Sequence, residues 1–198
     1  MFEEKRLPTV KRLQKMERVL NFRQPDLTVV CENIHDPHNV SAILRSCDAV
    51  GVPEIHLLYT SEKFPKLGRK SSASANKWIE VKKYKKYPDL RKVLKKQQMI
   101  IYATSLDPSA RNIFEIDWTM PAAILVGNEH RGVSAEALQI ADQKIYIPMF
   151  GMVESLNVSV ATAVILYEVC RQRWQAGLYL IKKDQHWLRK NLEKWTKP

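Results

Sequence analysis

The chain has 198 residues, a length that supports one substantial hydrophobic core rather than two full domains. No apolar run approaches the roughly 18 residues of a membrane-spanning helix, and the opening MFEEKRLPTVKR lacks the apolar core of a secretory signal. Cys31, Cys47 and Cys170 are odd in number and form no CxxC pair. We therefore expect a cytoplasmic protein with no disulfide framework, no structural zinc and no membrane anchor.

The net charge of +11 is concentrated in three segments. Residues 1–25 carry +4, residues 63–96 carry +11 and residues 171–198 carry +6, whereas residues 26–62 and 97–170 carry −5 each. Clustered Lys and Arg side chains favour a polyphosphate partner, because they release its counterions together on binding. Solvated lysine faces are the plain alternative for any one segment, but three basic segments with aromatic residues among or beside them favour nucleic acid.

Hydrophobic periodicity predicts a basic helix at each end of the chain and alternating strands and helices between them. The expected elements are a helix over 9–22, a strand over 27–34, a helix over 39–52 ended by Gly51, strands over 54–59 and 78–83, a helix over 88–98, strands over 99–104 and 122–127, a helix over 134–141, a strand over 144–149, a helix over 156–176 and a final basic helix.

This alternation predicts an α/β fold with a mostly parallel sheet and helices on both faces. We expect a basic N-terminal extension over 1–25, one α/β domain over 26–176 and a basic amphipathic helix within 177–198. Residues 60–77 are rich in serine and lysine and show no periodicity, so they are expected to form a mobile surface loop suited to act as a lid.

In open parallel sheets, ligands bind beyond the carboxyl ends of the strands, so the residues after each strand are the candidates for chemistry. These are ATSLD (103–107), GNEHRG (127–132) and MFGMVESLN (149–157). Neither a GxGxxG fingerprint nor a phosphate-binding loop nor an HExxH pattern occurs. His35 and His38 are interpreted as loop residues before a helix, and we expect no metal.

Three ordered stretches, NVSAILRSCDAVG (39–51), LVGNEHRG (125–132) and IPMFGMVESLNVSVATAV (147–164), resemble the motifs of the SPOUT superfamily of RNA methyltransferases. Short helical extensions at both ends are similar to those of the TrmH family, which methylates the ribose 2′-hydroxyl of guanosine 18 in the tRNA D-loop. The resemblance spans residues 26–176 and implies a C-terminal trefoil knot, a homodimer, tRNA as partner and S-adenosylmethionine as cofactor. Methylation of another tRNA or rRNA nucleotide, and a non-catalytic RNA-binding protein on the same scaffold, are the alternatives.

The resemblance also implies roles for five polar residues. Arg45 matches the catalytic arginine, Asn39 the asparagine that helps to set it, and Glu129 the acid of the second motif, while Ser155 and Asn157 match the polar pair of the third. Because a guanidinium stays protonated in proteins, we expect Arg45 to bind the phosphate beside the target ribose and orient the 2′-hydroxyl. Without the resemblance, each residue has a simpler interpretation. Arg45 is then a solvated residue on a helix, Asn39 is a helix N-cap, and Glu129 either caps the next helix or faces solvent.

The helix over 156–176 is apolar on almost all sides but begins with polar residues. We expect Ser155 to cap it, Asn157 to orient substrate or neighbouring loops, and its apolar surface to pack between the sheet and a partner subunit.

The resemblance places S-adenosylmethionine among main-chain groups around four positions, of which all but the glycine are equally explained as core: Thr104, Gly127, Ile147 and Leu156. Candidates for tRNA phosphate contacts are basic residues at the start of the chain and at the end of the long helix, with solubility as the plain alternative. They are Lys11, Arg12, Arg18, Arg23, Arg171 and Arg173.

Overall fold

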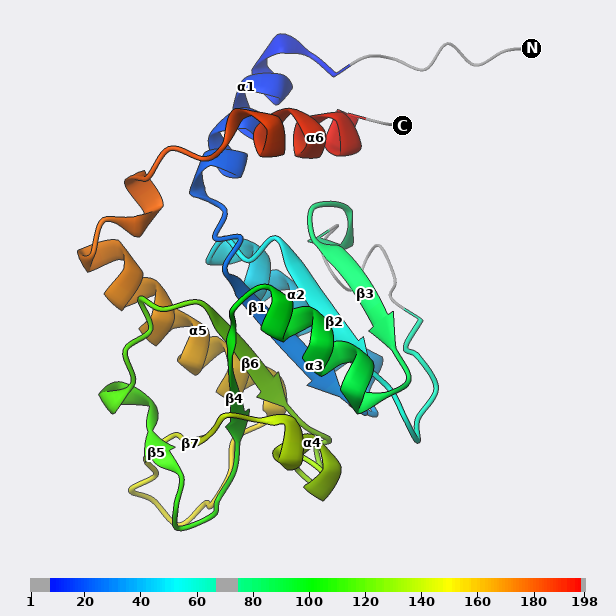
Figure 1. Ribbon diagram of the computed structural model, residues 1–198, viewed down its shortest axis with the longest axis vertical. Coiled ribbons are helices and arrows are strands. Elements are labelled where there is room, and N and C mark those ends of the chain that lie inside the picture. Colours follow the sequence, from blue (N-terminus) through cyan, green and yellow to red (C-terminus); the bar gives the residue numbers. More distant parts are fainter. Residues whose placement is uncertain (1–7, 67–74, 197–198) are drawn as a thin grey trace.

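A computed structural model describes residues 8–66 and 75–196 and arranges them around a seven-stranded sheet (Figure 1). The strand pairs are parallel, in the order β3-β2-β1-β6-β4-β7-β5. The centre of the loop expected over 60–77, residues 67–74, lies outside the described residues. The strands are β1 (Leu27–Glu32), β2 (Glu54–Leu58), β3 (Glu80–Tyr84), β4 (Ile100–Thr104), β5 (Arg111–Asn112), β6 (Ala122–Val126) and β7 (Gln143–Tyr146).

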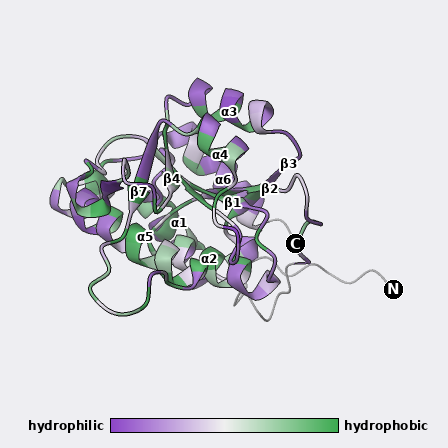
Figure 2. Ribbon diagram, turned by 90° about the horizontal axis from the view of Figure 1, so that it is seen from below, coloured by the Kyte–Doolittle hydropathy of each residue, from purple (hydrophilic) through white to green (hydrophobic). Residues whose placement is uncertain are grey.

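Helices cover both faces of the sheet, with α2 and α5 on one side and α3 and α4 on the other (Figure 2). None of the helices in the described ranges is long and apolar enough to span a membrane. The helices are α1 (Val10–Phe22), α2 (Pro37–Ala49), α3 (Tyr87–Lys96), α4 (Ala135–Ile140), α5 (Val158–Gln175) and α6 (Gln185–Thr196), with short 3-10 turns η1 (Ala75–Lys77), η2 (Ile113–Glu115) and η3 (Leu178–Leu180).

The central strands are buried on both faces, which explains their unbroken apolar sequences. Successive side chains of a strand point to opposite faces, so β1 sends Val29 toward α2 and α5 and Val30 toward α3 and α4. In β6, Ile124 and Leu125 divide in the same way. The expected α/β fold with a parallel sheet is therefore confirmed.

Two local features differ from the sequence-based expectation. The segment between β4 and β6, for which no element was expected, holds the two-residue strand β5 and the turn η2. The long helix begins at Val158, because the side chain of Asn157 accepts hydrogen bonds from the backbone N–H groups of Ser159 and Val160 and so caps it. The expectation that Ser155 caps this helix is wrong, since Ser155 is exposed in the preceding loop.

The terminal helices α1 and α6 pack together at the amino ends of the strands (Figure 1). Met16 and Leu20 of α1 are buried, whereas no residue of α6 is. The end of α2 lies close to the end of α1: Gly51 has a φ of +86°, and a Cβ there would lie 2.7 Å from the carbonyl oxygen of Phe22. A side chain at this position would be strained and would collide with the backbone.

Candidate active site

The loops after β1 and β6 leave the sheet side by side, because these strands are paired up to Cys31 and Val126. The loop after β6 is a tight turn in which Asn128 and Gly132 exchange backbone hydrogen bonds of 3.0 and 2.9 Å. A Cβ on Gly127 would lie only 2.2 Å from the carbonyl oxygen of Gly132. The glycine is therefore required by this turn, which presents Glu129 to the loop after β1.

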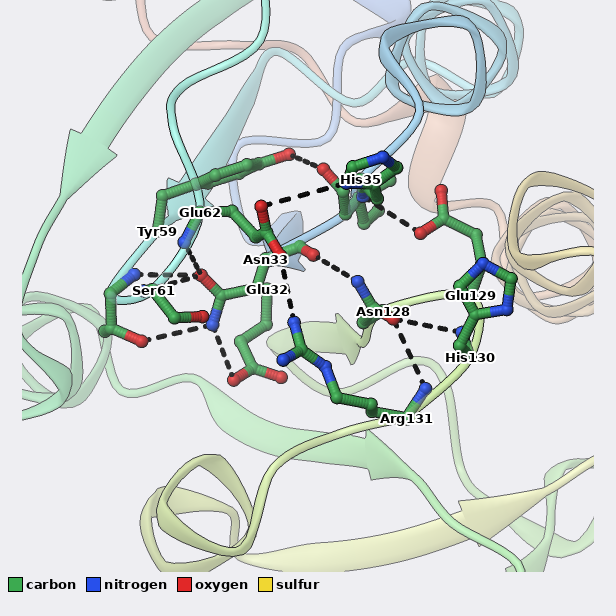
Figure 3. A network of polar contacts seen from close by, with 12 residues as sticks. Glu32, Asn33, His35, Tyr59, Ser61, Glu62, Asn128, Glu129, His130 and Arg131 are labelled. Atoms are coloured by element: carbon green, nitrogen blue, oxygen red, sulfur yellow. Dashed lines mark hydrogen bonds and ion pairs between the residues drawn. The ribbon is translucent and has the colours of Figure 1, made fainter.

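The carboxylate of Glu129 binds the start of α2. It accepts a hydrogen bond from the backbone N–H group of His35 at 2.9 Å (Figure 3). It also accepts from the backbone N–H group of Asp36 (3.1 Å) and from the side-chain amide of Asn39 (2.8 Å). Asp36, not Asn39, caps the helix, through a 2.8 Å bond from the N–H of His38, and Ser134 caps α4. The two cap explanations suggested by the sequence therefore fail, and Asn39 and Glu129 contact each other instead.

Asn157 extends this contact to α5. Its side-chain amide donates to the side-chain oxygen of Asn39 at 3.1 Å, while its own oxygen caps α5. The three polar residues thus form one chain of hydrogen bonds, Glu129 to Asn39 to Asn157, joining segments 90 and 118 residues apart. Ser155, the other half of the expected pair, has no part in this chain.

Burial alone would raise the pKa of Glu129, but the side-chain hydrogen bond from Asn39 and the backbone hydrogen bonds from His35 and Asp36 outweigh it and hold that pKa below its usual range. The side chain is therefore a carboxylate at neutral pH. A carboxylate whose acceptor positions are filled is a poor general base. Its negative charge also lies at the N-terminus of α2, where the helix dipole favours it.

Arg45 projects from α2 into solvent. Within the described residues its guanidinium forms no ion pair, in contrast to Arg23, Arg131 and Arg173. The bidentate donor edge of Arg45 is thus free to receive an anion.

A second network, which the sequence did not reveal, holds the loop after β2 (Figure 3). Asn33 has a positive φ of 47°, and its side-chain oxygen accepts from the N–H groups of Thr60, Ser61 and Glu62. Asn128 donates to the carbonyl oxygen of Asn33 at 2.8 Å. An asparagine directly after a buried strand was the available signal, since asparagine tolerates this conformation.

The four expected cofactor positions lie at the ends of neighbouring elements. β4 is paired with both β6 and β7, and Ser105 donates to the carbonyl oxygen of Ile145, so Thr104 and Gly127 lie on adjacent chains and Ile147 leaves the sheet beside them. Leu156, 36% exposed, precedes α5. Ile147 is half-buried and Leu156 is partly exposed, so apolar surface of the kind that lines ligand sites is available at these positions.

Two of the expected phosphate contacts are corrected. Arg23 and Arg173 have fully buried side chains, and each is bound to a carboxylate and to backbone carbonyls, so neither guanidinium lies on a surface that phosphate reaches. Lys11, Arg12 and Arg18 are exposed on α1. The side chain of Arg171 is 54% exposed and is paired with Glu168 at 2.7 Å. These four remain candidates.

The fold defines the class: an open parallel α/β protein in which hydrogen bonds link three segments beyond the carboxyl edge of the sheet, the edge where ligands bind in such folds. Comparison with known proteins then identifies the family. The chain belongs to the SpoU rRNA Methylase family, whose model matches residues 26–167.

Several proteins share this similarity. A tRNA (guanosine(18)-2'-O)-methyltransferase of Thermus thermophilus is 50% identical over 171 residues, covering 86% of this chain and 88% of that protein. The crystal structure of the Aquifex aeolicus TrmH/SpoU tRNA modifying enzyme superposes with a TM-score of 0.88 at 41% identity, covering 94% and 95% of the two chains. An AdoMet-bound rRNA methyltransferase from Sinorhizobium meliloti is more distant, with a TM-score of 0.65 at 25% identity over 78% of this chain and 59% of that one.

Replacing Glu129 with Gln tests its anchoring role. The variant leaves one N–H donor of the α2 start without an acceptor, so the free energy of unfolding should fall by about 1–2 kcal/mol near pH 7. Because the folded-state pKa is lowered, the contribution of Glu129 is complete above its unfolded pKa of about 4.3 and is lost as pH falls through the lower folded value. Urea unfolding at several pH values should therefore show a difference from wild type that shrinks in acid.

The matched control is Glu17→Gln, at an exposed position in the middle of α1, which should unfold like wild type throughout. A Glu129→Gln deficit that stays constant down to about pH 3 would contradict the anchoring role of the carboxylate.

Proposed function

We propose that this chain is a tRNA (guanosine-2'-O-)-methyltransferase that acts in the cytoplasm on the ribose of guanosine 18. Residues 26–176 form the catalytic domain in this proposal, and the basic segments on either side bind tRNA. Support comes from the relatives named for this activity at 41–50% identity over most of their length. The observation that carries it is the hydrogen-bond chain from Glu129 through Asn39 to Asn157, since it assembles polar residues of three separate motifs at one edge.

S-adenosylmethionine, when bound, supplies an activated methyl group on a sulfonium. Thr104, Gly127, Ile147 and Leu156 are the positions proposed to hold it. Support comes from the location of the first three at the carboxyl ends of β4, β6 and β7, from the exposure of Leu156 before α5, and from the AdoMet-bound relative.

Arg45 is the proposed catalytic residue. Its planar guanidinium binds the phosphate next to the target ribose and orients the 2′-hydroxyl, and a phosphate oxygen or water takes the proton. Asn39, Asn157 and Glu129 act as positioning residues that fix the start of α2 and hence the direction in which Arg45 projects. Ser155, exposed beside Asn157, is proposed to contact substrate.

Arg45→Ala should reduce methyl transfer to tRNA by about 100- to 1,000-fold, because it removes a charged donor at the reacting centre. Binding of S-adenosylmethionine, measured by calorimetry, should be unchanged. Arg45→Lys keeps the positive charge but loses the planar, bidentate donor geometry, and its turnover should remain at least about tenfold slower than that of the wild type. Arg91→Ala, an exposed arginine on α3 across the sheet, is the control for turnover at saturating tRNA.

The modified nucleotide is identified by mapping methylated unfractionated tRNA. Methyl groups at a position other than guanosine 18 would support the alternative enzyme activities, and binding of tRNA without any transfer would support the non-catalytic alternative. Near-wild-type turnover of Arg45→Lys would rule out a role that needs bidentate geometry.

We propose that the chain forms a homodimer through α5. Support comes from a stripe of exposed apolar side chains at helical spacing, Val160, Tyr167 and Trp174, which are 48%, 57% and 63% exposed, and from Phe150 and Met152 in the loop before it. An apolar stripe of this kind on a surface helix favours contact with another protein surface.

Light scattering should give a mass of twice 23.0 kDa for the wild type and of 23.0 kDa for Tyr167→Glu, which buries a charge in the proposed interface. Val10→Glu, at an exposed apolar position on α1, should leave the wild-type mass unchanged. A monomeric wild type would refute the dimer.

We propose that α5 is threaded through the loop between β4 and β6, forming a trefoil knot. Support comes from side chains of α5 that are bound to this loop: Gln172 contacts Trp118 and the carbonyl of Ile116, and Arg173 contacts the carbonyls of Trp118 and Met120.

Pulling a single molecule by its two ends should tighten such a knot, so the stretched chain should stay shorter than the about 3.3–3.6 Å per residue of an open chain. When the chain is instead pulled by its N-terminus and by a cysteine introduced at Met152, the segment after residue 152 is free to slip out of the loop. The stretched part should then reach the full length per residue of an open chain. Equal lengths per residue in the two experiments would refute the knot.

A further inference from the structure

A cleft that the proposed chemistry does not use lies at the amino ends of the strands, at the opposite end of the sheet from the candidate active site. It has a volume of about 160 Å³ and is lined by residues at the end of α1, from α6 and at the start of β3. Three tryptophans line it, Trp78, Trp187 and Trp195, together with Lys77 and Lys194. The lining thus combines aromatic surface with positive charge.

The three basic segments of the sequence all contribute to this cleft. Arg23 comes from the segment over 1–25, Lys77 and Trp78 come from the segment over 63–96, and Trp187, Lys194 and Trp195 come from the segment over 171–198. Segments that are separated along the chain by acidic stretches are thus brought together around one opening. Such convergence favours a polyanionic ligand.

The indole rings are not equivalent. Trp78 and Trp195 pack edge to face, with ring centroids 5.1 Å apart, and the guanidinium of Arg23 lies over Trp195 at 5.3 Å. Trp187 lines the cleft about two turns before Trp195 on α6 but has no ring partner among the described aromatic residues. It is half-buried, so part of its surface remains open.

The packing of α6 leaves polar and apolar side-chain surface exposed to solvent. No residue of α6 is buried, although the helix carries two tryptophans and two leucines. Arg23 also lines the cleft, but its buried guanidinium is already bound to Asp48 and to the carbonyl of Val52, so it adds positive charge rather than a contact for phosphate. Among the described residues, Lys194 forms a single exposed ion pair, with Glu80 at 2.7 Å, which another anion replaces easily.

We propose that this cleft binds an unpaired nucleotide of the tRNA, with its base stacked on Trp187 and its flanking phosphates near Lys77 and Lys194. Stacking on an aromatic ring accepts any base, and lysines neutralise the backbone, as in other proteins that bind single-stranded nucleic acid. The proposal rests on tRNA being the substrate. Because strands of five or six residues separate the cleft from the active site, at about 3.3 Å per residue, the bound nucleotide lies in a different part of the tRNA from the target ribose.

The test measures the affinity of the full chain for fluorescently labelled tRNA. Trp187→Ala should weaken binding by about 5- to 100-fold, the range found when a stacking aromatic is removed. Trp187→Phe keeps a π face and should bind within about threefold of wild type, whereas Trp187→Leu keeps apolar volume without a π face and should bind as weakly as the alanine variant. Phe114→Ala, an exposed aromatic on η2 outside the cleft, is the matched control.

Thermal unfolding of each variant separates stacking from packing of α6. Binding by Trp187→Leu equal to wild type, or an affinity of Trp187→Ala unchanged from wild type, would overturn the proposal.

Methyl transfer provides an independent readout: the KM for tRNA should rise in Trp187→Ala while the rate at saturating tRNA is unchanged. If the wild type binds tRNA through Trp187 but transfers no methyl group, the proposed nucleotide site is supported and the proposed activity is wrong. If methyl transfer occurs and does not depend on Trp187, the proposed activity is supported and the proposed nucleotide site is wrong.

Discussion

Three hydrogen bonds to the carboxylate of Glu129 hold the start of α2 against the turn after β6, and the rest of the site depends on this contact. Pairing of β1 with β6 aligns the two strands but does not fix the loops beyond them. The carboxylate fixes one loop against the other, Asn39 passes the constraint to Asn157, and Asn157 sets where α5 begins. The direction of Arg45 on α2 follows from the same anchor.

Two buried arginines hold the opposite end of the molecule in a comparable way. Arg23 joins the end of α1 to Asp48 of α2 and to the carbonyl of Val52, and Arg173 joins α5 to Asp26 and to the loop before β6. A buried guanidinium is tolerated only when carboxylates and carbonyls satisfy its donors, and removing one partner is strongly destabilising. These two arginines therefore stabilise the interior, whereas other basic residues of the same segments, such as Lys11, Arg18 and Lys190, are exposed.

The sequence predicted the order of strands and helices because periodicity and breaking residues determine both locally. It could not distinguish Arg45, which is exposed, from Arg173, which is buried, since both lie on amphipathic or apolar helices and their partners are distant in sequence. β5 was missed because two residues give no period to detect. Asn157 rather than Ser155 caps α5 because the loop geometry decides between two residues that are equally suited to capping.

The arrangement of the terminal helices has a consequence for biosynthesis. The central β1–β6 pair cannot form until about residue 126 has left the ribosome, and the tryptophan cleft needs α6, which is made after all the other described elements. All seven described strands are made before residue 185, whereas Trp187, Lys194 and Trp195 follow it. The cleft between α1 and α6 therefore forms only after every segment that builds the sheet has been synthesised.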